Sequence, residues 1–126
     1  MQVDAARIRA AGIVADAAWG VFVLAERDTA CVVGSGDISR KRGPWEVSYQ
    51  LRSASWGAGL AGEAVRCLVD WLFANMDERE LTAVTQDANQ RSIRMLERVG
   101  ARLVTCFEQY GVLQRQYLFQ PGSGNS

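Results

Sequence analysis

The chain has 126 residues, 48% of them hydrophobic, and its 14 lysines and arginines balance 14 aspartates and glutamates. This length suits one compact domain, expected to span residues 1–120 with a loose tail at 121–126, and leaves no room for a second domain. A net charge of zero creates no overall field that attracts nucleic acid or an anionic membrane surface, so neither is an expected partner.

Histidine is absent, and the three cysteines (Cys31, Cys67 and Cys106) lie far apart without C-x-x-C spacing. This excludes Ser-His and Cys-His nucleophile pairs, and it argues against a zinc cage, a disulfide framework or any other metal site. Residues 1–18 contain charges and no apolar run long enough for a signal peptide or a membrane span. We therefore expect a soluble cytoplasmic protein.

The first part of the chain predicts one helix and three strands. Residues 2–17 are rich in alanine with apolar residues near helical spacing, which favours a helix. Apolar runs at 19–25 and 30–38 predict two strands joined by a short turn. A polar turn at 40–44 then precedes residues 45–51, in which apolar and polar residues alternate as in a strand with one buried face.

The second part predicts two helices, a strand and a closing hairpin. An apolar stripe predicts a helix over 60–75, and a short strand follows at 81–85. Asp87 is the expected cap of the next helix, which should end at Gly100. The closing hairpin is expected to pair residues 102–107 with 112–119 around Tyr110-Gly111.

The turn between the 45–51 strand and the 60–75 helix is rich in glycine. Gly57 and Gly59 can adopt backbone angles closed to other residues, so several N–H groups can converge at the positive end of the helix and bind a phosphate. The segment Gly57 to Gly62 also matches the dinucleotide pattern G-x-G-x-x-G, with Asp77 20 residues beyond Gly57. A dinucleotide site needs its acid at the end of the next strand, however, and Asp77 precedes that strand. A purely structural tight turn is the other alternative.

Two longer motifs resemble a known family. The first comprises Glu46-Val47-Ser48-Tyr49 and Trp56-Gly57-Ala58-Gly59-Leu60-Ala61-Gly62-Glu63-Ala64, which is similar to E-x-G-Y followed by W-G-x-G-x-A-x-E-A. The second, Asn89 to Ala101, is similar to N-x-x-S-x-x-x-L-E-x-x-G-F, with Ala101 in place of the phenylalanine. In this order and spacing they resemble the GNAT superfamily of acetyl-CoA-dependent N-acetyltransferases, in particular the Rim-type branch that acetylates ribosomal-protein N-termini.

The resemblance implies an α/β (α+β) fold in which helices flank a central mixed, mostly antiparallel sheet. It also implies acetyl-CoA as cofactor. Its pantetheine arm would pair with the backbone of a splayed strand, and its pyrophosphate would bind the glycine turn. The residues implied are Gln50, Leu51, Arg52, Ser53, Trp56, Gly57, Ala58, Gly59, Leu60 and, near the pantetheine arm, Asn89. Packing in the core is the alternative role for Trp56, and capping the following helix is the alternative for Asn89.

Two residues are the candidate catalytic groups. Ser92 precedes Leu96 and Val99 by four and seven residues, so its hydroxyl should point inward from the helix. The resemblance implies that it protonates the departing thiolate of coenzyme A, whereas a bond back to the carbonyl of Ala88 is the structural alternative. Glu46, on the polar face of its strand, is the best available base for the attacking amine. Its alternative role is that of a solvated carboxylate.

The sequence therefore predicts an N-acetyltransferase that moves acetyl from acetyl-CoA to a primary amine by direct attack. A protein or peptide N-terminus is favoured as acceptor, with a small amine as second choice. The rival hypothesis is a catalytically degenerate module that retains the fold and the cofactor site. We also expect a homodimer, because few residues precede the strand at Trp19 and its edge would otherwise stay unpaired.

Overall fold

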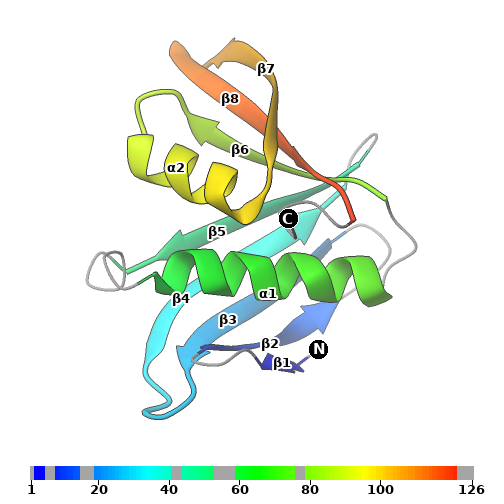
Figure 1. Cartoon of the computed structure of the whole chain (residues 1–126), viewed down its shortest axis with the longest axis vertical. Helices are drawn as coiled ribbons and strands as arrows, with labels where there is room; N and C mark the ends of the chain where they lie inside the picture. Colours follow the sequence, from blue (N-terminus) through cyan, green and yellow to red (C-terminus); the bar gives the residue numbers. More distant parts are fainter. Residues whose placement is uncertain are drawn as a thin grey trace.

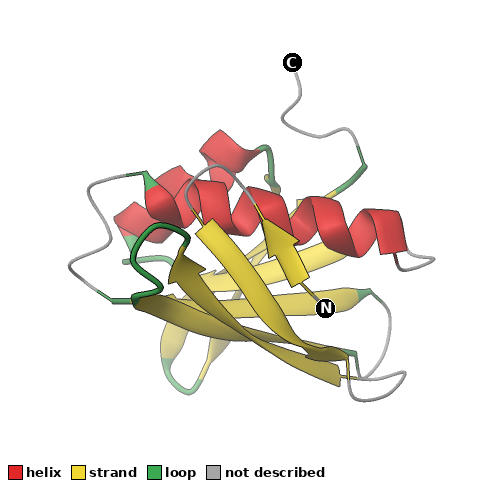
Figure 2. Cartoon of the chain, turned by 90° about the horizontal axis from the view of Figure 1, so that it is seen from below, coloured by secondary structure: helices red, strands yellow, loops and turns green. Residues whose placement is uncertain are grey.

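The computed structural model describes residues 2–4, 8–14, 19–40, 44–52, 59–75 and 79–121. The described strands form one eight-stranded sheet in the order β1-β2-β3-β4-β5-β6-β8-β7. Every neighbouring pair is antiparallel except β5 (Trp45–Leu51) and β6 (Leu81–Gln86), which are parallel. Helix α1 (Leu60–Asn75) lies across one face of this sheet, as Figures 1 and 2 show. This confirms the expected mixed, mostly antiparallel α/β fold.

The predicted helix at the start of the chain is wrong. Residues there form β1 (Gln2–Asp4) and β2 (Ile8–Val14), and β2 pairs with β3 (Trp19–Glu26) from Ile8↔Glu26 to Val14↔Gly20. Helix propensity is a weak preference, and the ladder of hydrogen bonds along β3 outweighs it. Gly12 permits this pairing, because a Cβ there would lie 2.0 Å from the carbonyl oxygen of Val21.

The expected β3–β4 pair and the alternating strand are confirmed. β4 (Val32–Ser39) pairs with β3 on one side and with β5 on the other. Since β3 is paired on both sides, the unpaired edge from which we expected a homodimer does not exist at that strand. Trp45 is buried in the core, as the alternation of residues 45–51 predicted for its apolar face.

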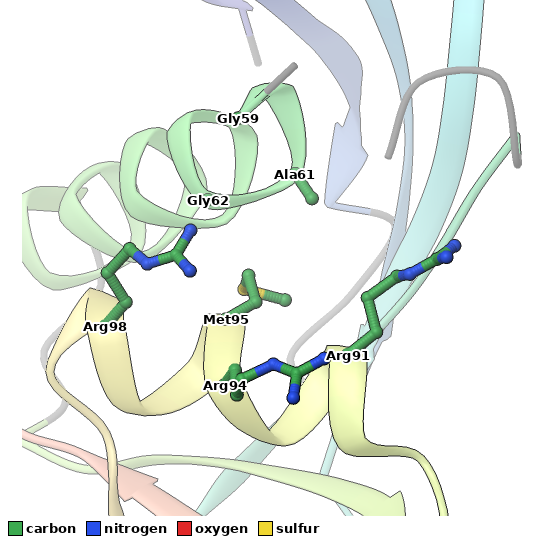
Figure 3. Close-up of a pocket in the computed structure, with 7 residues that line it drawn as sticks. All are labelled: Gly59, Ala61, Gly62, Arg91, Arg94, Met95 and Arg98. Carbon is green, nitrogen blue, oxygen red and sulfur yellow. The ribbon is translucent and has the colours of Figure 1, made fainter. Parts of the chain in front are cut away.

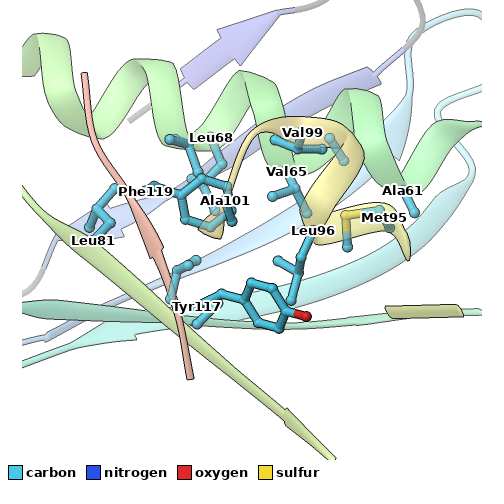
Figure 4. Packing of buried hydrophobic residues seen from close by; sticks show 14 of the residues in the cluster. Ala61, Val65, Leu68, Leu81, Met95, Leu96, Val99, Ala101, Tyr117 and Phe119 are labelled. Atoms are coloured by element: carbon cyan, nitrogen blue, oxygen red, sulfur yellow. The ribbon is translucent and has the colours of Figure 1, made fainter. Parts of the chain in front are cut away.

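One hydrophobic core lies between α1, the sheet and helix α2 (Gln90–Val99), and Figure 4 shows its packing. The α1 stripe of Ala61, Val65 and Leu68 packs with side chains of α2, including Leu96. Tyr117 and Phe119 of β8 (Val112–Phe119) are fully buried and belong to the same core on the side of the sheet. The core therefore fixes α2 against both α1 and the β6–β8 part of the sheet.

The closing hairpin is confirmed and projects from the body of the molecule in Figure 1. β7 (Arg102–Gln109) pairs with β8 around Tyr110 and Gly111, both of which have positive φ, 56° and 75°. This conformation fits a two-residue hairpin turn. β7 is an edge strand of the described sheet, and its Leu103 and Val104 are 44% and 51% exposed.

Candidate active site

The central feature of the site is an opening between β5 and β6. These parallel strands pair only at Trp45↔Leu81 and Glu46↔Thr82 and then separate toward α2, as Figure 1 shows. A pocket of about 410 Å³ occupies the opening. Its lining residues come from β5, from β6 and the following turn, from α2 and from β8: Val47, Ser48, Tyr49, Val84, Thr85, Gln86, Asn89, Ser92 and Gln114.

The opening leaves part of the β5 backbone without a neighbouring strand. The N–H of Arg52 donates to the carbonyl of Val33 at 2.8 Å, so it points toward β4. Backbone groups of successive strand residues point to alternate sides, which directs those of Leu51 and Tyr49 toward the opening. β5 therefore presents hydrogen-bonding backbone groups along one wall of the pocket.

Helix α2 begins at this pocket, and its cap is not Asp87 but Asn89, which confirms the alternative role predicted for Asn89. The Asn89 side chain accepts a hydrogen bond from the N–H of Ser92 at 3.1 Å, the geometry of an N-cap residue. Ser92 is 5% exposed and lines the opening, as the helix spacing predicted. The predicted end of the helix is confirmed, since Gly100 adopts the left-handed conformation with φ 106°.

Asp87 instead forms part of a polar chain that connects the β6–α2 turn to β8. Its carboxylate accepts a hydrogen bond from Arg115 Nε at 2.6 Å, and its N–H donates to Leu113 at 2.9 Å. Arg115 also donates to Tyr117 Oη at 3.4 Å, and that hydroxyl donates to Glu97 of α2 at 3.0 Å. Burial raises the pKa of Tyr117, so the tyrosine remains a neutral donor. These bonds fix the turn that presents Asn89 and Ser92 to the pocket.

Tyr49 is a site residue that was not predicted from the sequence. Its hydroxyl lies 3.2 Å from Ser92 Oγ, across the opening from β5 to α2. Burial raises the pKa of Tyr49, and the Ser92 contact opposes this only in part. The sequence signal was available, because Tyr49 shares the buried-face alternation of Trp45 and Val47.

Glu46 lies on β5 where the pairing with β6 ends. Successive side chains of a strand point to opposite faces, so Glu46 shares a face with Ser48 and lies opposite Val47 and Tyr49. Ser48, Val47 and Tyr49 all line the pocket, which is therefore bordered by residues of both faces. Glu46 is not among the residues that line this pocket, and it lies on the face of the sheet opposite to Tyr49 and its partner Ser92.

A second pocket, of about 280 Å³, lies between the first turns of α1 and the outer side of α2. Figure 3 shows its lining: Gly59, Ala61, Gly62, Arg91, Arg94, Met95 and Arg98. Three arginines of α2 thus lie beside the N-terminus of α1, the positive end of the helix macrodipole. This cluster was not predicted from the sequence either, although the spacing of Arg91, Arg94 and Arg98 places them on one helix face. An electropositive pocket of this kind suits phosphate groups.

Several expected cofactor residues lie outside the described residues: Ser53, Trp56, Gly57 and Ala58. Gly59 and Leu60 are described at the start of α1, where Gly59 has a φ of 76°, and Gln50 to Arg52 end β5. The dinucleotide alternative is wrong, because the described sheet has one parallel strand pair and no succession of parallel strands joined by helices.

Within the described part of the chain, no three metal-ligating side chains gather into a cluster. No helix within those ranges is both long and apolar enough to span a bilayer.

Two curated relatives are similar to this chain. The uncharacterized N-acetyltransferase p20 of Bacillus licheniformis is 26% identical, over 76% of this chain and 63% of its own length. The uncharacterized N-acetyltransferase YoaA of Bacillus subtilis is 27% identical, over 83% of this chain and 55% of its own length. The chain thus spans less than two thirds of either relative.

Solved structures share the fold at low identity. The GNAT-family acetyltransferase of Bacillus anthracis superimposes with a TM-score of 0.83 at 16% identity, covering 95% of this chain and 98% of that one. For the ribosomal-protein-S5-alanine acetyltransferase of Vibrio fischeri the TM-score is 0.72 at 20% identity, over 81% and 61%. The F149A variant of spermidine N-acetyltransferase SpeG of Vibrio cholerae gives 0.75 at 13%, over 86% and 69%. Residues 2–102 match the family described as "Acetyltransferase (GNAT) domain", and the chain therefore belongs to the GNAT acetyltransferase family.

Proposed function

We propose that this protein is an acetyl-CoA-dependent N-acetyltransferase that acts on a primary amine. The observation that carries the proposal is the opening between β5 and β6, with Ser92 at its wall and an arginine-lined pocket beside it. Both pockets border the first turns of α2, to which Ser92 and Arg91 contribute from adjacent positions. One elongated ligand with a phosphate end and a reactive end fits this arrangement.

Acetyl-CoA fits the residues of these two pockets. Its phosphates suit the three arginines and the N-terminus of α1, because guanidinium groups and helix N–H groups both bind phosphate oxygens. The amide groups of its pantetheine arm suit the backbone of Tyr49 and Leu51, which face the opening. Asn89 is committed to capping α2 through its side-chain oxygen, which leaves its amide nitrogen for the cofactor.

The proposed reaction is a direct attack without an acyl-enzyme. The amine nitrogen forms a bond to the thioester carbon, and the carbon–sulfur bond breaks. Glu46, directly or through a water molecule, takes the proton that the amine loses, and the hydroxyl of Ser92 gives a proton to the departing sulfur. Solvent returns a proton to Ser92 as the products leave. The position of Glu46 and Ser92 on opposite faces of the sheet supports this division, because separate groups can then take the proton of the amine and give a proton to the sulfur.

For the acceptor, we favour a protein or peptide N-terminus, as in the Rim-type branch. The motifs Glu46 to Tyr49 and Asn89 to Gly100 support this choice. The structural neighbours include enzymes named for a ribosomal-protein alanine and for spermidine, so a small polyamine is the second candidate.

The test combines binding with turnover. Calorimetry should show that acetyl-CoA binds in preference to NAD, and a thiol-release assay with N-terminal peptides and polyamines should show turnover. Binding of NAD alone would refute the cofactor assignment. Acetyl-CoA binding without turnover on any amine would favour the degenerate cofactor-binding module instead.

We further propose that the protein forms a homodimer. The edge at β3 no longer supports this proposal, but the β7 edge does, because Leu103 and Val104 are exposed on it. Unpaired strand edges with apolar side chains favour association. Light scattering at micromolar concentration tests the proposal, and a strictly monomeric active protein would refute it.

A further inference from the structure

Two hydrogen bonds hold Ser92 in place, one from its backbone to Asn89 and one between its hydroxyl and that of Tyr49. The Asn89 side chain accepts from the Ser92 N–H at 3.1 Å, which fixes the backbone. The Ser92 hydroxyl lies 3.2 Å from Tyr49 Oη, although the two residues are 43 positions apart in the chain. Both side chains line the opening between β5 and β6. The hydroxyl pair therefore lies where the proposed reaction takes place.

The direction of this hydrogen bond decides what Ser92 can do. Only one of the two hydroxyls can donate to the other, and a phenol is the stronger acid of the pair. Burial raises the pKa of Tyr49 above its ordinary value of 10.0, so the phenol keeps its proton at neutral pH. With Tyr49 as donor, the Ser92 oxygen accepts, and the proton of Ser92 is free to point into the pocket.

We propose that Tyr49 is a positioning residue that orients the Ser92 hydroxyl toward the sulfur of the thioester. This inference rests on the proposed acetyltransferase function. As the carbon–sulfur bond breaks, the Ser92 proton moves to the sulfur and negative charge develops on Ser92 Oγ. The Tyr49 hydrogen bond stabilises this charge, because hydrogen bonds strengthen when the acceptor becomes charged. Tyr49 itself keeps its proton throughout and forms no bond to the substrate.

The ring and the hydroxyl of Tyr49 have separable roles. The ring packs against the hydrophobic core, whereas the hydroxyl contacts Ser92. Tyr49→Phe keeps the ring and removes only the hydroxyl. Tyr110→Phe is the control, because it also removes a phenol hydroxyl, from a side chain that is 93% exposed in the β7–β8 turn and lines neither pocket.

The experiment is a double-mutant cycle on turnover, with acetyl-CoA and the best amine acceptor of the wild-type protein. Tyr49→Phe should lower kcat about tenfold, the effect of one hydrogen bond to a developing charge, with KM for acetyl-CoA unchanged. Ser92→Ala should lower kcat by about 10²- to 10⁴-fold. Adding Tyr49→Phe to Ser92→Ala should cause no further loss, because the tyrosine acts through the serine. Tyr110→Phe should leave kcat unchanged.

Two results would overturn the inference while leaving the acetyltransferase function intact. They are an unchanged kcat in Tyr49→Phe, with or without a raised KM for acetyl-CoA, and an equal loss from Tyr49→Phe in the Ser92→Ala background. A wild-type protein without turnover on any amine would instead refute the proposed function, and the inference with it. Calorimetric binding of acetyl-CoA to each variant shows that it is folded.

Discussion

The arginine pocket gives the most direct test of how the cofactor binds. Arg94 and Arg98 lie on the exposed side of α2 and line the pocket beside Gly62 of α1. The double substitution Arg94→Gln and Arg98→Gln removes two positive charges while retaining much of each side chain's length. We expect weaker binding of coenzyme A, because its phosphates lose two guanidinium partners.

The magnitude follows from the exposure of these side chains. Both arginines are exposed, so solvent screens their charges and each contributes about 0.2–1 kcal/mol, as exposed ion pairs do. The pair together contributes up to about 2 kcal/mol, which corresponds to a rise in Kd of up to roughly 30-fold. The loss should shrink as salt is added, because the interaction is electrostatic and exposed.

The assay is calorimetric titration with coenzyme A and with dephospho-coenzyme A, which lacks the 3′-phosphate, at low and at moderate salt. The matched control is Arg27→Gln with Arg79→Gln, which removes the same charge outside both pockets. The wild-type protein should prefer coenzyme A to dephospho-coenzyme A more strongly than the variant does. Equal affinities in wild type and variant, or an equal loss in the control, would refute the assignment of this pocket to phosphate.

The remaining predictions concern two glycines and one tyrosine. Gly62→Ala should raise the free energy of unfolding by about 0.5–1 kcal/mol, because alanine favours the helix and the new Cβ would have its nearest neighbour at 3.8 Å; destabilisation in urea would contradict this. Gly36→Ala should lower the free energy of unfolding by about 1–3 kcal/mol or more in the same assay, because its Cβ would lie 2.3 Å from the Phe22 ring. A variant as stable as the wild type would contradict this and show that the sheet adapts. The pKa of Tyr49 is raised in the folded state, so the contribution of its titration to stability is fully present below pH 10.0 and is lost as the pH rises toward the folded pKa. Tyr49→Phe should therefore lessen the fall of Tm at alkaline pH, and an unchanged fall would contradict this assignment.

The sequence by itself determined the elements that have strong local signals. The alternation in 45–51, the apolar stripe of 60–75 and the terminating Gly100 predicted their strand, helix and helix end correctly. Each of these depends on side chains within one element, where periodicity reports which face is buried. The inward direction of Ser92 was predictable for the same reason.

Tertiary structure decided the features that depend on contacts between distant segments. Residues 2–4 and 8–14 form strands instead of the predicted helix, because β1 pairs with β2 and β2 pairs with β3. Asp87 is not the cap of α2, because Arg115 of β8 binds its carboxylate while Asn89 binds the helix N-terminus. The family resemblance implied that β5 separates from a neighbouring strand. The packing of α2 and β8 decides that the separation begins after Glu46 and which residues line the opening. The contact of Tyr49 with Ser92 joins two segments that no local pattern connects. Local periodicity shows which side of an element is buried, whereas the partner that it meets there depends on how the whole chain packs.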